Sequence, residues 1–203
     1  MGARLIAFLA FFGFSAIAHA GGGPLGIDHR WNVDDTGLWR RSNQNLLRYG
    51  VLVGDVGFAV WEGGESRIGR TAWQSIDSVA ASGLVAEGAK RAFGRERPRD
   101  NPDPGQWRNG GRSFPSGEVT EITAIVTPYV LEYRHDHPAV WALELLPAYD
   151  AIARMKVQAH WQTDVLAGFA LGTAAGYLAH QRDNPVILSV LPHGFAIGLK
   201  KRF

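Results

Sequence analysis

A histidine and an aspartate stand four residues apart in the stretch that reads ARMKVQAHWQTD. Side chains at this spacing share one face of a helix, so Asp164 can accept a hydrogen bond from one ring nitrogen of His160. The other ring nitrogen is then free to act as a nucleophile. Arg154 can meet this pair as an anion clamp only if the chain turns between them, and we expect that turn at Gln158 and Ala159. An ordinary ion pair on a helix surface is the plainer interpretation of the same spacing.

A basic stretch that reads KRAFGRERP precedes this pair in the sequence. Lys90 and Arg97 are seven residues apart and so nearly aligned on one face of a helix, which Pro98 then ends. Two cations at a helix end can bind one phosphate group. A solvated basic turn that complements the helix dipole is the alternative.

A third stretch reads RSFPSGE and leads into a predicted helix. Ser116 is typical of a helix N-cap, and Gly117 leaves backbone N–H groups open to an anion at the helix start. Taken alone, the stretch is equally typical of an ordinary capped helix.

The three stretches, in the order K-x6-R-P, P-S-G-x and R-x5-H-x3-D, resemble the signature of the type 2 phosphatidic acid phosphatase superfamily. That superfamily includes bacterial nonspecific acid phosphatases, lipid phosphate phosphatases and vanadium haloperoxidases. The sequence departs from it at two positions: Glu118 stands where the family has histidine, and Ala153 where serine is usual. The matching residues are Lys90, Arg97 and Pro98, then Pro115, Ser116 and Gly117, then Arg154, His160 and Asp164.

This resemblance implies hydrolysis of phosphomonoesters or diphosphates, with or without a lipid, through a phosphohistidine and without a metal ion or other cofactor. His160 would attack phosphorus, and Asp164 would orient it and stabilise its positive form. The phosphate oxygens would be held by five residues: Lys90, Arg97, Ser116, Gly117 and Arg154.

Glu118 leaves the function open, because the histidine that it replaces protonates the leaving oxygen in the family. If a phosphate dianion and burial raise the pKa of Glu118, it can serve as the general acid. Otherwise it only complements the helix dipole. A phosphate- or lipid-binding protein with impaired catalysis is therefore the main alternative, and a vanadate-dependent oxidase is a third.

Composition predicts one globular domain: the chain has 203 residues, of which 46% are hydrophobic and 20% charged. A net charge of +2 is too small to indicate nucleic-acid binding, and the absence of cysteine excludes disulfides and a cysteine nucleophile. Charge is nevertheless concentrated between Lys90 and Arg112, with seven basic and three acidic residues. We interpret this segment as the anion-attracting mouth of the site.

The N-terminus is typical of a cleaved signal peptide, residues 1–20, with one basic residue, an apolar run and a small-x-small pattern. Retention as a membrane anchor is the alternative. A signal peptide implies export across the inner membrane, to the periplasm or to its membrane surface. We expect the phosphatase-like domain at 21–184 and a hairpin or tail at 185–203.

Hydrophobic periodicity predicts an all-α fold, a bundle of about five to six helices without a membrane span. The loop 98–114 is long enough to cover the site. His135 and His137 resemble a metal pair only superficially, so no metal site is predicted. The expected partner is a phosphorylated small molecule or lipid, with at most peripheral membrane contact; the oligomeric state is not indicated. The predicted helices cover 36–61, 66–93, 118–133, 139–155 and 160–180.

Overall fold

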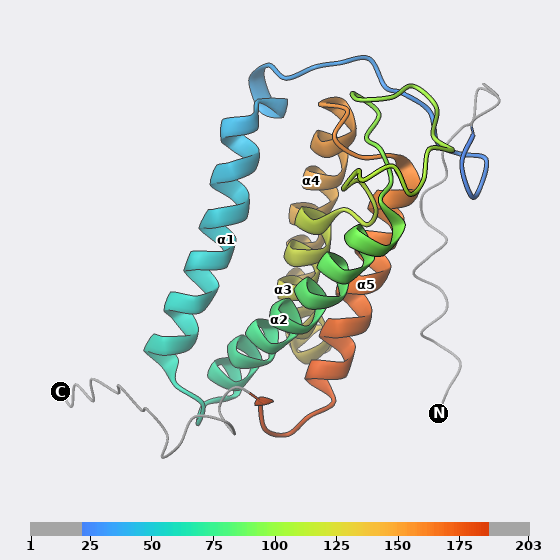
Figure 1. The fold of residues 1–203 in the computed structure, drawn as a ribbon. Helices are drawn as coiled ribbons and strands as arrows, with labels where there is room; N and C mark the ends of the chain where they lie inside the picture. Colours follow the sequence, from blue (N-terminus) through green and yellow to red (C-terminus); the bar gives the residue numbers. More distant parts are fainter. Residues whose placement is uncertain (1–21, 187–203) are drawn as a thin grey trace.

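The computed structural model describes residues 22–186. The predicted signal peptide and most of the predicted C-terminal hairpin lie outside these residues. Within them the fold is all-α, as predicted (Figure 1). The five α-helices are α1 (Arg41–Glu62), α2 (Arg67–Phe93), α3 (Gly117–Tyr133), α4 (Leu145–Lys156) and α5 (Gln162–His180).

Local signals in the sequence account for the bounds of α2, the helix that carries Lys90. Its first turn is capped by Ser66, whose hydroxyl accepts a hydrogen bond from the N–H of Gly69 at 3.0 Å. Its end is set by Gly94, which adopts the left-handed conformation (φ 53°) and donates to the Lys90 carbonyl. Lys90 therefore lies in the last turn of the helix.

Helices α3 and α5 pack at close range through glycines spaced four apart on one side of α5. A Cβ on Gly168 would lie 2.8 Å from the Ser116 carbonyl oxygen, and one on Gly172 would lie 2.6 Å from the Thr120 carbonyl oxygen. The same close approach continues at Gly176. Since Ser116 and the segment before α5 both belong to the predicted site, this packing sets how closely they approach each other.

Three predicted elements differ from the structure. The helix expected over 139–155 begins as a 3-10 helix, Pro138–Glu144, before α4. The helix expected over 36–61 begins later, after a short 3-10 turn at Gly37–Trp39. Arg97 does not share a helical face with Lys90, because Gly94 ends α2 three residues before it and Arg97 lies in the following loop.

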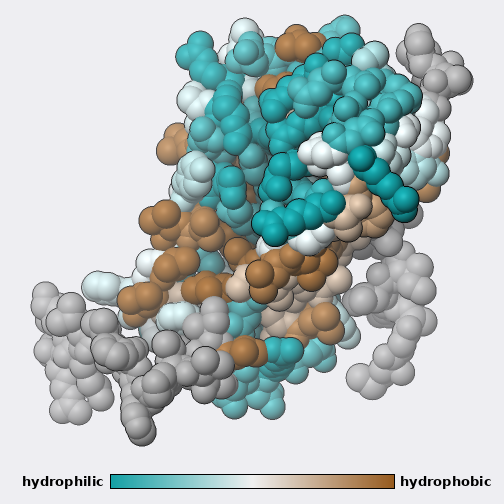
Figure 2. Space-filling view, viewed as in Figure 1, coloured by the Kyte–Doolittle hydropathy of each residue, from teal (hydrophilic) through white to brown (hydrophobic). Residues whose placement is uncertain are grey.

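Hydrophobic side chains remain exposed along α1. Leu46, Tyr49, Val53, Val56 and Val60 recur at spacings of three and four residues and are 39% to 73% exposed. Such spacing places them in one stripe on the helix surface. In Figure 2, hydrophobic residues gather across the lower part of the face formed by α1 and α2, and hydrophilic residues dominate its upper part. Among the described residues, no helix combines the length and hydropathy that crossing a bilayer requires.

Candidate active site

The three motif stretches meet at one end of the bundle, where α2 and α4 end and α3 and α5 begin (Figure 1). The backbone N–H of Ser116 donates to the Asp164 carbonyl oxygen at 2.9 Å. The Lys90 ammonium donates to the carbonyl oxygen of Pro115. The predicted turn before His160 is present, with Gln158 in the left-handed conformation (φ 51°). The predicted phosphate-binding and catalytic residues thus share one region.

His160 is buried, 4% exposed, in the turn between α4 and α5. Its Nδ1 lies 2.7 Å from the carbonyl oxygen of Ser113. Because a carbonyl can only accept, Nδ1 carries the hydrogen and Nε2 carries a lone pair. Burial lowers the pKa of His160 to about 4; Asp164 opposes this effect and the positive charge of Arg154 adds to it. The ring is therefore neutral at neutral pH, with Nε2 available as a nucleophile.

The predicted hydrogen bond between His160 and Asp164 is wrong. Nδ1 lies 3.8 Å from the nearer carboxylate oxygen, which is too long for a hydrogen bond. The helical spacing argument does not apply, because His160 precedes the first residue of α5. Asp164 instead accepts hydrogen bonds from the Ser113 hydroxyl at 2.5 Å and the Trp161 N–H at 2.8 Å. Its negative charge still lies beside the ring.

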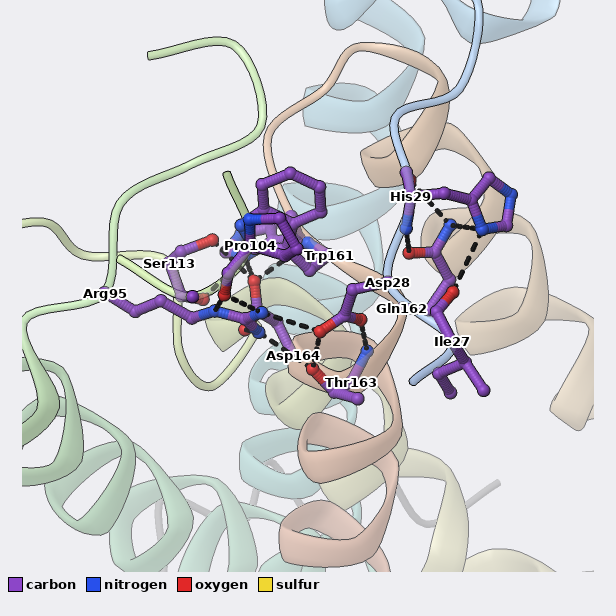
Figure 3. A network of polar contacts seen from close by, with 12 residues as sticks. Ile27, Asp28, His29, Arg95, Pro104, Ser113, Trp161, Gln162, Thr163 and Asp164 are labelled. Atoms are coloured by element: carbon purple, nitrogen blue, oxygen red, sulfur yellow. Dashed lines mark hydrogen bonds and ion pairs between the residues drawn. The ribbon is translucent and has the colours of Figure 1, made fainter. Parts of the chain in front are cut away.

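A buried ion-pair network fixes Asp164 (Figure 3). The Arg95 guanidinium lies between two carboxylates, donating to Asp164 and to Asp28 at 2.6 Å each, and all three side chains are 0% exposed. Asp28 also accepts from the backbone N–H and the hydroxyl of Thr163. Breaking a buried pair of this kind leaves an uncompensated charge and costs about 3 to 5 kcal/mol. Asp164 is consequently held in one orientation.

Among the three predicted phosphate-binding cations, Arg97 repels both Lys90 and Arg154. Burial and, after it, the charge of Arg97 lower the pKa of Lys90 to about 8. Burial also lowers the pKa of Arg97, as does the charge of neighbouring Arg99. For Arg154 burial again lowers the pKa, although Glu118 opposes it. A bound anion would relieve both the repulsion and the cost of burial.

Two of the predicted phosphate-binding residues carry a buried polar atom without a hydrogen-bond partner: the Ser116 hydroxyl oxygen and Nε of Arg154. Buried polar groups are nearly always paired, so these two need explanation. Ser116 stands at the N-cap position of α3, but its hydroxyl makes no capping bond. Gly117 follows, where a Cβ would lie 3.4 Å from Cε of Lys90. These open donors suit the oxygens of a phosphate group.

Glu118 is bound by a residue outside every motif. Arg41 on α1 donates to both of its carboxylate oxygens, at 2.7 Å each, and Arg154 lies 3.6 Å away. Burial acts to raise the pKa of Glu118, but the hydrogen bonds from Arg41 and the charge of Arg154 outweigh it and the pKa lies below its usual value. Of the two alternatives left open for Glu118, the ligand-free protein favours the ionised carboxylate, because Arg41 supplies a counter-charge.

A second carboxyl, Asp150, lies one helical turn before Arg154. It is fully buried, and neither of its oxygens has a hydrogen-bond partner. Burial raises its pKa to about 7, and the negative charge of Glu118 acts in the same direction. The pKa of Glu118 is thus lowered and that of Asp150 is raised. Near neutral pH, Glu118 is ionised and Asp150 is partly protonated.

The sequence motifs do not point to four residues that support this region. Arg95 lies inside the first motif but is not one of its matching residues, so the sequence marks it only as one of several basic residues there. Asp28 lies in an N-terminal arm, where it forms an isolated antiparallel β-bridge with Gly22, and Arg41 and Gln44 lie on α1. Gln44 is buried and accepts a hydrogen bond from Arg154 at 2.9 Å. No spacing could have identified them, because each partner is distant in the sequence.

Two further features bear on ligands. A cavity of about 170 Å³ adjoins the site between α1, α2 and α3, with Lys90 and Gly117 in its wall. Between residues 22 and 186, no three His, Cys, Asp or Glu residues gather closely enough to hold a metal ion.

The family model of the PAP2 superfamily matches residues 71–186, more than half of the chain. The chain belongs to the PAP2 superfamily. The resemblance seen in the three motifs is thereby confirmed, and the PAP2 match contains all of them.

Curated relatives of this PAP2 chain are lipid A 1-phosphatases. The protein of that name from Rhizobium johnstonii is 33% identical over 102 residues, which cover 47% of this chain and 41% of the relative. The one from Porphyromonas gingivalis is 28% identical over 127 residues, covering 61% of this chain and 26% of the relative. The chain thus matches less than half the length of these relatives. No solved structure matches it significantly.

Proposed function

We propose that this PAP2 protein is a phosphatase that hydrolyses a phosphorylated lipid through a covalent phosphohistidine on His160. One observation carries the proposal: a neutral, buried His160 with its Nε2 lone pair free lies within electrostatic reach of Lys90 and Arg154, two cations whose pKa values burial lowers. The names of the curated relatives support a lipid phosphate as substrate. The cavity beside Lys90 and Gly117 offers room for the part of the substrate next to the phosphate.

In the proposed reaction, Nε2 of His160 attacks phosphorus and the bond from phosphorus to the leaving oxygen breaks, with its electron pair going to that oxygen. Lys90, Arg97 and Arg154 stabilise the charge on the phosphoryl oxygens. Asp164, fixed by Arg95, stabilises the positive charge that forms on the imidazole. Water then attacks the phosphohistidine and releases phosphate. No metal ion takes part, so activity should persist in a chelator.

We assign Glu118 a positioning role. Its contacts with Arg41 and Arg154 keep it ionised, and an ionised carboxylate cannot donate a proton to the leaving oxygen. It instead holds two guanidinium groups beside the site. The leaving oxygen must then be a good leaving group or be protonated by water. The same observation favours the second candidate function, a phosphate- or lipid-binding protein with impaired turnover.

Export and membrane contact complete the proposal. Residues 1–20 serve as a signal peptide, which places the protein in the periplasm. The exposed apolar stripe of α1 supports peripheral contact with a membrane, from which a lipid substrate can be taken.

The covalent intermediate provides the test. Purified wild type is mixed with a lipid carrying ³²P in its phosphate, quenched and analysed for acid-labile, alkali-stable label on histidine. His160→Ala should lose the label and at least about 10³-fold in turnover. The matched control His137→Ala, an exposed histidine at the opposite end of the bundle, should keep both. Label on another residue, or full turnover in His160→Ala, would refute the mechanism; phosphate binding without turnover in wild type selects the second candidate.

A further inference from the structure

Seven basic residues lie between Lys90 and Arg112, and the structure gives them different surroundings. Arg95 is buried and paired with two aspartates. Lys90 and Arg97 belong to the candidate active site, and Arg99 lies 3.6 Å from an acidic neighbour. The remaining three line a separate pocket together with Lys90: Arg91, Arg108 and Arg112.

This second pocket has a volume of about 530 Å³ and lies between the end of α2 and the loop 98–114. Four of its eight lining residues carry a positive side chain and none is acidic. The backbone of Gly110 and Gly111 forms another part of the wall. A pocket of this charge and size suits a phosphate group and the atoms attached to it.

The cations of the pocket are only partly neutralised. Arg91 and Arg112 share a single carboxylate, that of Glu87, at 3.0 Å and 2.6 Å. Arg108 has no ion pair and no side-chain hydrogen bond to any residue between 22 and 186. Its backbone is nevertheless held in place, because its N–H donates to the carbonyl of Phe93 at 2.8 Å. Arg108 thus has a fixed backbone and an exposed guanidinium whose donors are free for a ligand.

Lys90 connects this pocket with the candidate active site. It lines the second pocket, and it also lines the cavity that contains Gly117. Its pKa is lowered by burial, then by Arg97 of the active site, and also by Arg112 of the second pocket. The ammonium therefore lies within electrostatic reach of cations on both sides.

We propose that the second pocket binds a second phosphate group of the substrate while the first is held at His160, with Lys90 between them. This inference rests on the proposed function and narrows it to substrates with two phosphate groups. Two sources share this chemistry. The groups can form a diphosphate, in which case the broken bond leaves its electron pair on the bridging oxygen and the leaving phosphate needs no proton. They can also stand apart on one molecule.

Steady-state kinetics on three substrates separate these cases: an alkyl monophosphate, the alkyl diphosphate of the same chain, and an alkanediol bisphosphate. Losing one charged contact to phosphate costs about tenfold or more. Arg108→Gln should therefore lower kcat/KM by about tenfold on the diphosphate, the bisphosphate or both, and leave the monophosphate unchanged. Arg108→Lys should restore most of the loss. Arg182→Gln removes another exposed charge, beyond the far end of α5, and should change nothing.

Equilibrium binding keeps the inference separate from the proposed reaction. Inorganic diphosphate and inorganic phosphate are titrated calorimetrically into His160→Ala, with and without Arg108→Gln. Weaker binding of diphosphate alone, or a selective kinetic loss on either two-phosphate substrate, supports the pocket even if wild type shows no turnover. If Arg108→Gln changes neither quantity, the second pocket does not bind phosphate, whatever the fate of the phosphohistidine mechanism.

Discussion

At the scale of single residues, burial has opposite consequences for the roles of His160 and Lys90 although it lowers the pKa of both. For His160 the shift to about 4 favours the neutral, nucleophilic ring. For Lys90 the shift to about 8 brings loss of the positive charge close to physiological pH. Chemistry that needs a neutral histidine and a charged lysine is therefore confined between these two values.

We accordingly expect kcat/KM to fall below about pH 4, as His160 is protonated, and above about pH 8, as Lys90 loses its proton. Lys90→Arg should remove the alkaline limb, because arginine stays charged. Glu118→Gln should move neither limb, because Glu118 is ionised throughout most of this range. Ionisation of the substrate affects wild type, Lys90→Arg and Glu118→Gln equally. The ratio of each variant's kcat/KM to that of wild type therefore reports only the titration of groups on the enzyme. An alkaline limb that persists unchanged in Lys90→Arg would rule out Lys90 as its source.

The motif residues could be predicted because their spacing within each stretch is short. Their supporting residues could not, and Asp28 shows why: it reaches Arg95, 67 residues away, from an arm without regular structure. The same reason explains why the sequence left the role of Glu118 open, since its pKa depends on Arg41, 77 residues away. Local pattern predicts which residues can do chemistry, but the protonation state follows from contacts between distant segments.

At the scale of helices, glycines in this protein differ in whether a neighbouring helix leaves room for a side chain. On α5, Gly172 faces α3 so closely that a Cβ would lie 2.6 Å from the Thr120 carbonyl oxygen. On α2, a Cβ on Gly88 would have no atom within 4 Å apart from its chain neighbours and the backbone of its own helix. The first glycine allows two helices to meet, whereas the second only adds flexibility to the unfolded chain.

The same substitution should therefore have opposite effects at the two sites. Gly172→Ala should destabilise the protein by about 1 to 3 kcal/mol through overpacking. Gly88→Ala should stabilise it by about 0.5 to 1 kcal/mol through helix propensity. Urea unfolding of both variants beside wild type measures the two changes. Destabilisation of similar size at both positions would show that the close contact between α3 and α5 is not what matters.

The helices themselves were largely predictable, and their ends show where prediction stops. Ser66 and Gly94 are strong local signals, so α2 was placed within a residue of its bounds. Pro98 predicts a helix that continues as far as Arg97, whereas Gly94 ends α2 three residues earlier. The sequence does not reveal the 3-10 segment before α4. Over so few residues, the spacing of hydrophobic side chains in a 3-10 helix is hard to distinguish from that in an α-helix.

At the scale of the whole molecule, polar and apolar surfaces are separated. The candidate site lies at the end of the bundle where hydrophilic residues dominate the surface, and the apolar stripe of α1 runs away from that end (Figure 2). Leu46 and Val53 in this stripe are 73% and 67% exposed. Such an arrangement allows one side of the protein to rest on a lipid surface while the site stays open to water.

Flotation with anionic phospholipid vesicles tests this arrangement. The double variant Leu46→Ser and Val53→Ser should bind vesicles roughly tenfold more weakly than wild type, because two exposed aliphatic side chains no longer enter the lipid. Leu25→Ser with Leu38→Ser is the matched control: both leucines are similarly exposed but lie outside α1, and binding should persist. Equal vesicle binding by wild type and the α1 variant would exclude this stripe as the contact.

The ion pair between Asp28 and Arg95 has a consequence for how this PAP2 domain should be cut. The family match begins at residue 71, so a fragment trimmed to it keeps every motif residue. That fragment would still lack Asp28, the second counter-charge of a fully buried guanidinium, and Arg41, the partner of Glu118. The segment needed for an intact site therefore begins at or before Asp28, well before the family match begins. Expression boundaries chosen from motifs alone would yield a protein with an intact signature and a loosened site.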